Sequence, residues 1–162
     1  MPDATDLQIL RILEENGRIT NREIAERVGV SEGTVRNRIE RMIREDLLRI
    51  VGVVNPQKLG LTTTAVIAVS CELPRLADVA ERIAAVDNVV YVGYTTGTAD
   101  LICLGFFPGT DALTDFLTGT LASIPGITKV ETSIILKSVR SLFPAAGRYL
   151  PTSAAARAAA ER

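Results

Sequence analysis

The spacing of the apolar residues changes once along this chain, near residue 55, and this change most limits the folds open to it. Before it, apolar residues recur every three or four positions, which is the period of an amphipathic helix. After it, β-rich apolar runs alternate with two helical stretches. Asn55-Pro56 is a natural break, because proline lacks an N–H and disfavours helix at the preceding residue. The sequence therefore predicts two small domains, 1–54 and 62–142, with a linker over 55–61 and a tail over 143–162.

Capping residues separate three predicted helices in the first domain. Asp6 is expected to cap the first helix, which ends before Gly17. Thr20 is followed three residues later by Glu23, which is the spacing of a capping box, and Ser31 is expected to cap the third helix. The apolar residues at helical spacing are Leu7, Leu10, Leu13, Ile24, Ala25, Val28, Val35, Ile39 and Met42.

A short turn, Val28-Gly29-Val30-Ser31, joins the second and third predicted helices. Gly29 can adopt a positive φ at little cost, and Val30 can fill the gap between the helices. This pattern is typical of a helix-turn-helix, a motif that places its second helix in the major groove of DNA. The apolar stretch 47–54 that follows predicts a strand or a short hairpin.

The outward face of the third predicted helix carries groups suited to DNA. Small or hydrogen-bonding residues lie near its N-terminal end, where base edges come closest, and arginines beside them can reach bases or phosphates. Gly33 inside a helix costs about 1 kcal/mol relative to alanine, which favours a functional reason for it. The residues singled out for DNA contact are Ser31, Gly33, Thr34, Arg36, Asn37, Arg38 and Arg41.

A solvated helix face is the alternative interpretation of the same charges. Glu32–Arg36, Glu40–Arg44 and Glu45–Arg49 are spaced i,i+4 with glutamate first, an order that stabilises helices. Residues 1–50 contain 9 arginines and 10 acidic residues, so their net charge does not favour DNA binding. The prediction rests on the turn and on where the arginines lie.

The second domain is predicted to have the order β-α-β-β-α-β. Two similar turns, at Val86 and Ile124, lie 38 positions apart, and each joins a helix end to a strand start. Asn88 and Gly126 in these turns tolerate the left-handed conformation that ends helices. This repeat is typical of a ferredoxin-like fold. The expected strands are 64–71, 89–96, 100–107 and 127–139, and the expected helices are 76–86 and one capped by Thr110.

The composition excludes several classes of protein. The chain has no histidine, which excludes Ser-His-Asp and Cys-His catalysis and histidine-containing zinc sites. Cys71 and Cys103 are too few for a disulfide scaffold or a cysteine-only zinc site, and their apolar neighbours predict core positions. No apolar run approaches the roughly 18 residues of a membrane span, and no signal-peptide pattern begins the sequence. We expect a cytoplasmic protein without catalytic residues, metal or cofactor; a site of Tyr91 or Tyr94 with Asp100 is the enzymatic alternative.

A series of segments over about residues 6–142 resembles the Lrp/AsnC family, the feast/famine transcription regulators. The segments are Asp6–Leu10, Asn16–Thr20, Glu23–Ser31, Val35–Ile39, Asn55-Pro56, Leu59-Gly60, Gly97–Asp100 and Gly126–Thr132. The resemblance implies an α+β fold, with a winged helix-turn-helix followed by a ferredoxin-like regulatory domain of the RAM type. It also implies a homodimer, often assembled into an octamer, that binds double-stranded DNA. Asp46 stands where members commonly have glycine, and the stretch after it lacks their usual aromatic residue.

The resemblance further implies a small effector, usually an amino acid, bound at an interface between regulatory domains. Carried onto this sequence, its site consists of Thr96, Gly97, Thr98, Ala99 and Asp100, with Thr132 and Ser133 as neighbours. The amides of this turn can hold a carboxylate and Asp100 can meet an ammonium group. A structural role is equally open, in which Asp100 accepts backbone N–H groups and Gly97 supplies its φ. For the whole chain, the alternative function is a small-molecule-sensing oligomerisation module whose helix-turn-helix contacts protein.

Overall fold

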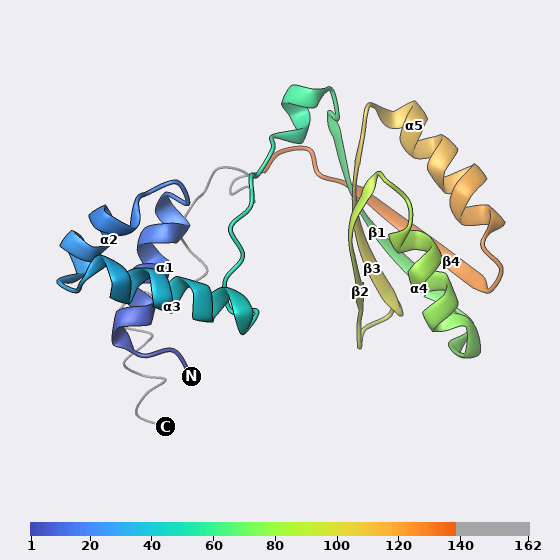
Figure 1. Cartoon of the computed structure of the whole chain (residues 1–162). Coiled ribbons are helices and arrows are strands. Elements are labelled where there is room, and N and C mark those ends of the chain that lie inside the picture. The colour runs from blue at the N-terminus through green and yellow to red at the C-terminus, as the bar shows by residue number, and fades with distance from the viewer. Residues whose placement is uncertain (139–162) are drawn as a thin grey trace. The chain divides into compact units, whose positions relative to one another are not determined.

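The structure is a computed structural model that describes residues 1–138, and it divides into two compact units (Figure 1). The first contains Met1–Val54 and the second begins at Asn55. The expected tail 143–162 lies outside the described residues. In the first unit the helices are α1 (Ala4–Glu15), α2 (Asn21–Val28) and α3 (Glu32–Arg44). In the second the main elements are β1 (Thr63–Cys71), α4 (Leu76–Ala84), β2 (Val89–Tyr94), β3 (Leu101–Phe107), α5 (Thr110–Asp115) and β4 (Ile127–Ile134).

Each helix of the first unit begins at a side-chain cap. Thr20 caps α2 in a capping box with Glu23, and Ser31 caps α3, as the sequence predicts. The prediction that Asp6 caps α1 was wrong, because Asp3 is the cap and Asp6 is the third helical residue. Each of these carboxylates accepts the backbone N–H of the other residue, at 2.8 and 3.0 Å. Two aspartates three positions apart both satisfy the pattern, so the spacing alone did not identify which one is the cap.

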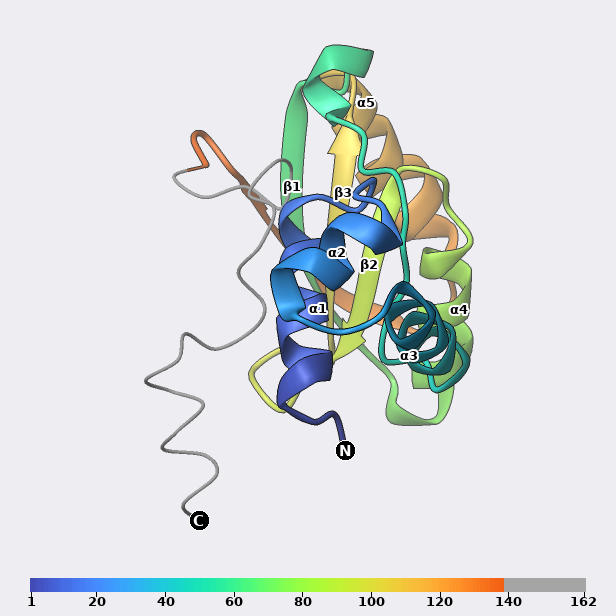
Figure 2. The same cartoon turned by 60° about the vertical axis from the view of Figure 1, so that its left-hand side comes forward.

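The predicted turn between α2 and α3 is present. Gly29 ends α2 with a φ of 78°, and its N–H donates to the Ala25 carbonyl at 2.8 Å. The inner faces of the three helices then close on one apolar core, in which Ile9, Val35 and Met42 are fully buried. Figure 2 views α3 nearly along its axis, with the turn leading into it from α2. The helix-turn-helix is thus held by a glycine stop, a serine cap and a common core.

The strand or hairpin predicted over 47–54 does not form. No residue of this stretch pairs with a strand within residues 1–138. Instead, the N–H groups of Leu47 and Leu48 both donate to the Met42 carbonyl, and Asp46 takes a φ of 54°. A β-rich sequence forms a strand only where a second strand supplies hydrogen bonds, and the first unit has none. The exposed apolar residues here are Leu47, Ile50, Val51, Val53 and Val54.

The second unit has the predicted βαββαβ order and one antiparallel sheet. The strand order is β2-β3-β1-β4, so β1 and β3 lie at the centre, and α4 and α5 cover one face (Figure 1). This is the ferredoxin-like topology. β4 ends at Ile134, short of the predicted 139, a residue that lies outside the described chain. Thr110 is the first residue of α5 rather than its cap, and the Gly109 before it makes no side-chain cap.

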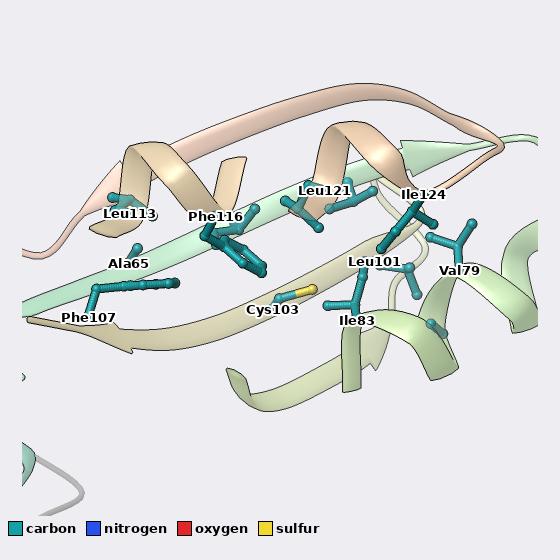
Figure 3. Close-up of a cluster of buried hydrophobic side chains, with 13 residues drawn as sticks. Ala65, Val79, Ile83, Leu101, Cys103, Phe107, Leu113, Phe116, Leu121 and Ile124 are labelled. Atoms are coloured by element: carbon teal, nitrogen blue, oxygen red, sulfur yellow. The ribbon is translucent and has the colours of Figure 1, made fainter. Parts of the chain in front are cut away.

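The core of this unit lies between the sheet and its two helices. Alternate residues of β1 and β3 meet one side of α4 and α5, and Figure 3 shows Phe107 and Phe116 lying together, with ring centroids 5.3 Å apart. Cys103 lies in this core, as predicted, and burial raises the pKa of its thiol to about 11. Cys71 is partly buried against the same core, and burial also raises the pKa of its thiol. Both cysteines are free thiols that serve as packing residues.

The two turns predicted to be left-handed differ. Gly126 has a φ of 99°, and a Cβ there would lie 2.5 Å from Cδ of Arg75. Asn88 does not enter the left-handed region. Its side-chain amide donates to the Phe106 carbonyl at 3.1 Å, and its backbone carbonyl accepts the Phe106 N–H at 2.9 Å. Asn88 therefore joins the end of the α4 segment to β3 through its side chain, a role that its spacing did not indicate.

Candidate functional site

The N-terminal part of α3 presents a polar surface with open space above it. Ser31 Oγ accepts the N–H of Thr34 at 3.1 Å, and the two hydroxyl oxygens lie 2.8 Å apart. A Cβ on Gly33 would meet nothing closer than 3.9 Å, so another molecule can approach the backbone here. Arg36 and Asn37 are exposed. Five of the predicted DNA contacts, from Ser31 to Asn37, therefore share one accessible end of the helix.

The other two predicted DNA contacts, Arg38 and Arg41, bind carboxylates of α1. Arg38 Nη1 lies 2.6 Å from Asp3 Oδ2 and 2.8 Å from Asp6 Oδ1. Arg41 Nη2 lies 2.6 Å from Asp6 Oδ2. Sequence analysis missed these partners, which lie 32 to 35 positions away, because no local pattern links residues so distant.

Asp6 is the buried centre of this cluster, with 1 % of its side chain exposed. Burial raises the pKa of its carboxyl, but hydrogen bonds from Arg41, from Arg38 and from the Asp3 backbone outweigh it and hold the pKa at about 2. Because three donors serve its two oxygens, the carboxylate is charged and satisfied.

The intrahelical pairs of the alternative interpretation do not form. Glu32–Arg36, Glu40–Arg44 and Glu45–Arg49 are absent from the ion pairs of residues 1–138. Arg36 and Arg44 have no ion-pair partner within that range, whereas Arg38 and Arg41 do. The arginines of α3 thus fall into two groups, one bound to α1 and one open to solvent.

The predicted effector turn, 95–100, is held by its own backbone and by Asp100. Asp100 Oδ2 accepts the Cys71 N–H at 2.9 Å, and its N–H donates to the Val69 carbonyl at 3.0 Å. Thr95 closes the turn, because its N–H donates to the Asp100 carbonyl and its hydroxyl to the Ala99 carbonyl. The structural role proposed for Asp100 is therefore present. The one proposed for Gly97 is not, since its φ is not positive.

The remaining effector candidates lie on a different strand. Thr132 and Ser133 are exposed on β4, opposite Ile67 and Val66 of β1. Because the sheet order is β2-β3-β1-β4, β1 lies between them and the turn, whose Asp100 is hydrogen-bonded to Val69 and Cys71 of β1. No hydrogen bond joins Thr132 or Ser133 to the turn in the described chain. Within one protomer, the structure does not bring the two halves of the predicted site together.

A helix-turn-helix unit joined to a ferredoxin-like unit defines a DNA-binding protein with a separate regulatory domain. Residues 2–49 match the family described as winged helix-turn-helix DNA-binding, and residues 64–143 match the Lrp/AsnC ligand binding domain. The chain is 38 % identical over 136 residues to an HTH-type transcriptional regulator of Pyrococcus furiosus. This alignment covers 83 % of this chain and 92 % of that protein. The chain is 28 % identical over 141 residues to the regulator Ptr1 of Methanocaldococcus jannaschii, in an alignment that covers 86 % and 95 % of the two chains.

Solved structures agree with these matches. AsnC of E. coli superposes with a TM-score of 0.82 at 26 % identity, covering 87 % of this chain and 96 % of that one. A transcriptional regulator of Neisseria meningitidis, solved as a complex with L-Met, gives 0.85 at 27 % identity, covering 96 % and 99 %. The chain belongs to the Lrp/AsnC family and is a DNA-binding transcription regulator with a ligand-binding domain. Within residues 1–138, no helix combines the length and the apolar character that crossing a membrane requires.

Proposed function

We propose that residues 1–54 bind a specific double-stranded DNA sequence through α3, that 55–61 are a linker, and that 62–142 sense a small molecule. The observation that carries this proposal is the capped, accessible end of α3, where Thr34 and Asn37 offer hydrogen-bonding groups. A helix placed in the major groove reads base edges with such groups and positions itself with cations on phosphates. Arg36 supplies the nearest open cation. Ser31 has a small side chain and Gly33 has none, so the backbone at the start of α3 can approach the DNA.

The small molecule is an amino acid or a related metabolite. The regulator from Neisseria meningitidis was solved with L-Met, and this chain shares its fold. Asp100 uses only Oδ2 to hold the turn, and Oδ1 accepts no hydrogen bond from residues 1–138. Oδ1 can therefore meet an ammonium group, while the amides of 97–99 hold a carboxylate. Thr96 completes the site from the turn, and Thr132 and Ser133 complete it from β4.

The protein acts as a homodimer that assembles further, up to an octamer. The centre of the sheet face away from α4 and α5 is apolar, because strand register places Val66 beside Leu104 and Ala68 beside Ile102 there. On the same face, β4 adds the polar residues Ser133 and Glu131 at the edge. The four apolar residues are half-buried, and Tyr91 on the neighbouring strand has 58 % of its surface exposed. A contiguous apolar patch of this kind favours association. A second chain can also bring Thr132 and Ser133 of one protomer to the turn of another. Binding at such an interface would change the oligomer and hence the half-site spacing.

DNA selection from a random pool followed by anisotropy titration tests the first part. Arg36→Gln and Asn37→Ala are expected to weaken binding at least 10-fold, and Asn37→Ala to relax preference at one base pair. If both variants bind as wild type does, the helix-turn-helix contacts protein, which is the alternative function. The protein is proposed to act in the cytoplasm and to lack a catalytic role of its own, as its relatives are named regulators.

A thermal-shift panel of the twenty amino acids tests the second part. A ligand at 100 times its dissociation constant should stabilise the protein by roughly 2.7 kcal/mol. Asp100→Asn keeps an oxygen for the Cys71 N–H but removes the charge, so it should abolish the shift without lowering the unliganded midpoint. Native mass spectra with and without the hit then test whether the oligomer changes. An unchanged shift in Asp100→Asn would exclude the ammonium contact.

A further inference from the structure

The charge cluster between α1 and α3, formed by Asp3, Asp6, Arg38 and Arg41, has a geometry that the proposed DNA contact does not need. Arg38 touches both aspartates, and Arg41 touches Asp6 alone. The Asp6 side chain is 1 % exposed, whereas Arg38 and Arg41 are 27 % and 36 % exposed. The cluster is therefore built around one buried carboxylate on α1.

A buried carboxylate is costly unless its partners stay with it. If Arg38 or Arg41 swung away to a DNA phosphate, Asp6 would lose one of the donors that offset its burial. Leaving a buried charge without its partner costs much more than one solvent-exposed ion pair returns. This balance favours both arginines staying on Asp6 when another anion is available at the surface.

The two arginines contact Asp6 from positions three apart on α3, about one helical turn. Contacts spaced in this way oppose both rotation of α3 about its axis and sliding along it. Relative to the buried Val35, Arg38 projects about 60° to one side and Arg36 about 100° to the other, at about 100° per residue. The cluster thus holds one flank of α3 against α1 and leaves the flank with Arg36 free.

We propose that Asp6 is a positioning residue for the recognition helix, and that Arg38 and Arg41 stay bound to it in the DNA complex and do not contact DNA. This inference rests on the proposed function and revises the prediction that these two arginines bind bases or phosphates. Their role is to set the direction in which Thr34 and Asn37 meet the bases. Arg36 is then the cation of the N-terminal half of α3 that meets the phosphate backbone.

The test is the salt dependence of DNA binding by the full chain. Anisotropy titrations use the selected operator and an unrelated duplex of equal length, at several salt concentrations. Each lost phosphate contact lowers the slope of log K against log salt by about 0.9. Arg36→Gln should lower it by about that amount per bound protomer. Arg38→Gln and Arg41→Gln should leave the slope on the unrelated duplex unchanged, and reduce the ratio of specific to non-specific affinity at least 10-fold.

A conservative variant separates charge from geometry. Arg38→Lys keeps a positive charge, which is enough for a phosphate contact, but lacks the planar fork that spans Asp3 and Asp6. It should keep the salt slope and still lose discrimination between the two duplexes. Asp6→Asn should lose the same discrimination, with a slope equal to or steeper than that of wild type, because the freed arginines can reach phosphates. Arg82→Gln breaks an exposed Arg–Asp pair on α4 and is the matched control, with neither quantity changed.

Two results would overturn the inference alone, and a third would overturn it together with the proposed function. If Arg38→Gln or Arg41→Gln lowers the slope as Arg36→Gln does, these arginines contact phosphates. If Arg38→Lys binds both duplexes as wild type does, charge alone is their role. If Arg36→Gln also leaves the slope unchanged, α3 does not bind phosphates, and the proposed function fails together with the inference. Thermal melts of each variant show whether a lost ratio comes from a folded protein, since unfolding lowers both affinities equally.

Discussion

Replacement of Asp6 by asparagine tests how much the charge cluster stabilises the first unit. The pKa of the Asp6 carboxyl falls from 3.8 to about 2 in the folded protein. Since one pKa unit corresponds to 1.36 kcal/mol, this difference is worth about 2 kcal/mol of stability at neutral pH. Asparagine resembles the protonated acid in shape and charge. Asp6→Asn should therefore lower the free energy of unfolding of the first unit by about 2 kcal/mol at pH 7.

The effect has a definite dependence on pH. A carboxyl whose pKa is lower in the folded state stabilises the fold above its unfolded pKa, and this contribution disappears as pH falls through the folded pKa. The difference between wild type and Asp6→Asn should therefore be full above about pH 5, shrink between about pH 4 and pH 2, and vanish below that. The charges of Arg38 and Arg41 do not change in this range.

The chain offers two separate probes for the measurement. The chain has no tryptophan, and its tyrosines are Tyr91, Tyr94 and Tyr149. In a Tyr149→Phe background both remaining tyrosines lie on β2, so tyrosine fluorescence reports on the second unit. Circular dichroism at 222 nm includes α1, α2 and α3. Urea unfolding of Asp6→Asn at pH 7, 5 and 3 should shift the dichroism transition and leave the tyrosine transition in place.

Asp78→Asn is the matched control, because it removes an aspartate from an exposed pair with Arg82 in the second unit. An exposed pair of this kind contributes about 0.5 kcal/mol or less. A loss below about 0.5 kcal/mol for Asp6→Asn at pH 7, or an equal loss at pH 7 and pH 3, would refute the reasoning. Either result would mean that the carboxylate is not held as a buried ion.

Three further outcomes follow from single positions. Asp46→Gly should stabilise the first unit by about 0.5 kcal/mol, because Asp46 has a φ of 54° and glycine adopts this left-handed conformation without strain. The relieved strain exceeds the extra chain entropy that glycine loses on folding, and a lower dichroism midpoint would contradict this. Gly126→Ala should destabilise the second unit by at least about 1 kcal/mol in tyrosine-monitored unfolding, since φ is 99° and the new Cβ would lie 2.5 Å from Cδ of Arg75; an unchanged midpoint would count against the turn. Cys71 should react with a thiol reagent in the native protein well before the buried Cys103, as mass spectrometry of the labelled chain can establish, and equal rates would argue against the packing.

The parts of the fold that sequence analysis predicted are those with local signals. Thr20 with Glu23 is a capping box in the sequence and in the structure, and Gly29 has the positive φ expected of it. The βαββαβ order followed from changes of apolar period, each of which spans only one element. Such signals depend on a residue and its near neighbours, so they remain valid whatever the rest of the chain does.

The errors occurred where a second segment decides the outcome. The stretch 47–54 has β-rich composition but no strand beside it, so its residues form no strand in the described chain. Its apolar residues stay exposed except Leu48, which packs against the core of the first unit. Asn88 tolerates the left-handed conformation, yet its side chain finds the Phe106 carbonyl instead. Asp3 and Asp6 each suit the cap position of α1, and only the start of the helix distinguishes them. In each case the local sequence has the stated preference, but contacts outside the local pattern determine the conformation that is adopted.

The arginines of α3 are the instance that matters most for function. A helical wheel gives the direction of a side chain but not what lies in that direction. Asp6 lies in the first turn of α1, where the helix dipole stabilises a negative charge. The packing of α1 also places this carboxylate against Arg38 and Arg41. Of the arginines on α3, this leaves Arg36 and Arg44 without an ion-pair partner among residues 1–138, in a chain whose net charge is -1. Two open cations on α3 supply little non-specific affinity from this helix, so tight binding by α3 depends on base contacts and on several protomers held on one DNA. The cluster that limits electrostatic attraction thereby makes recognition depend on the orientation of α3, which the same cluster sets.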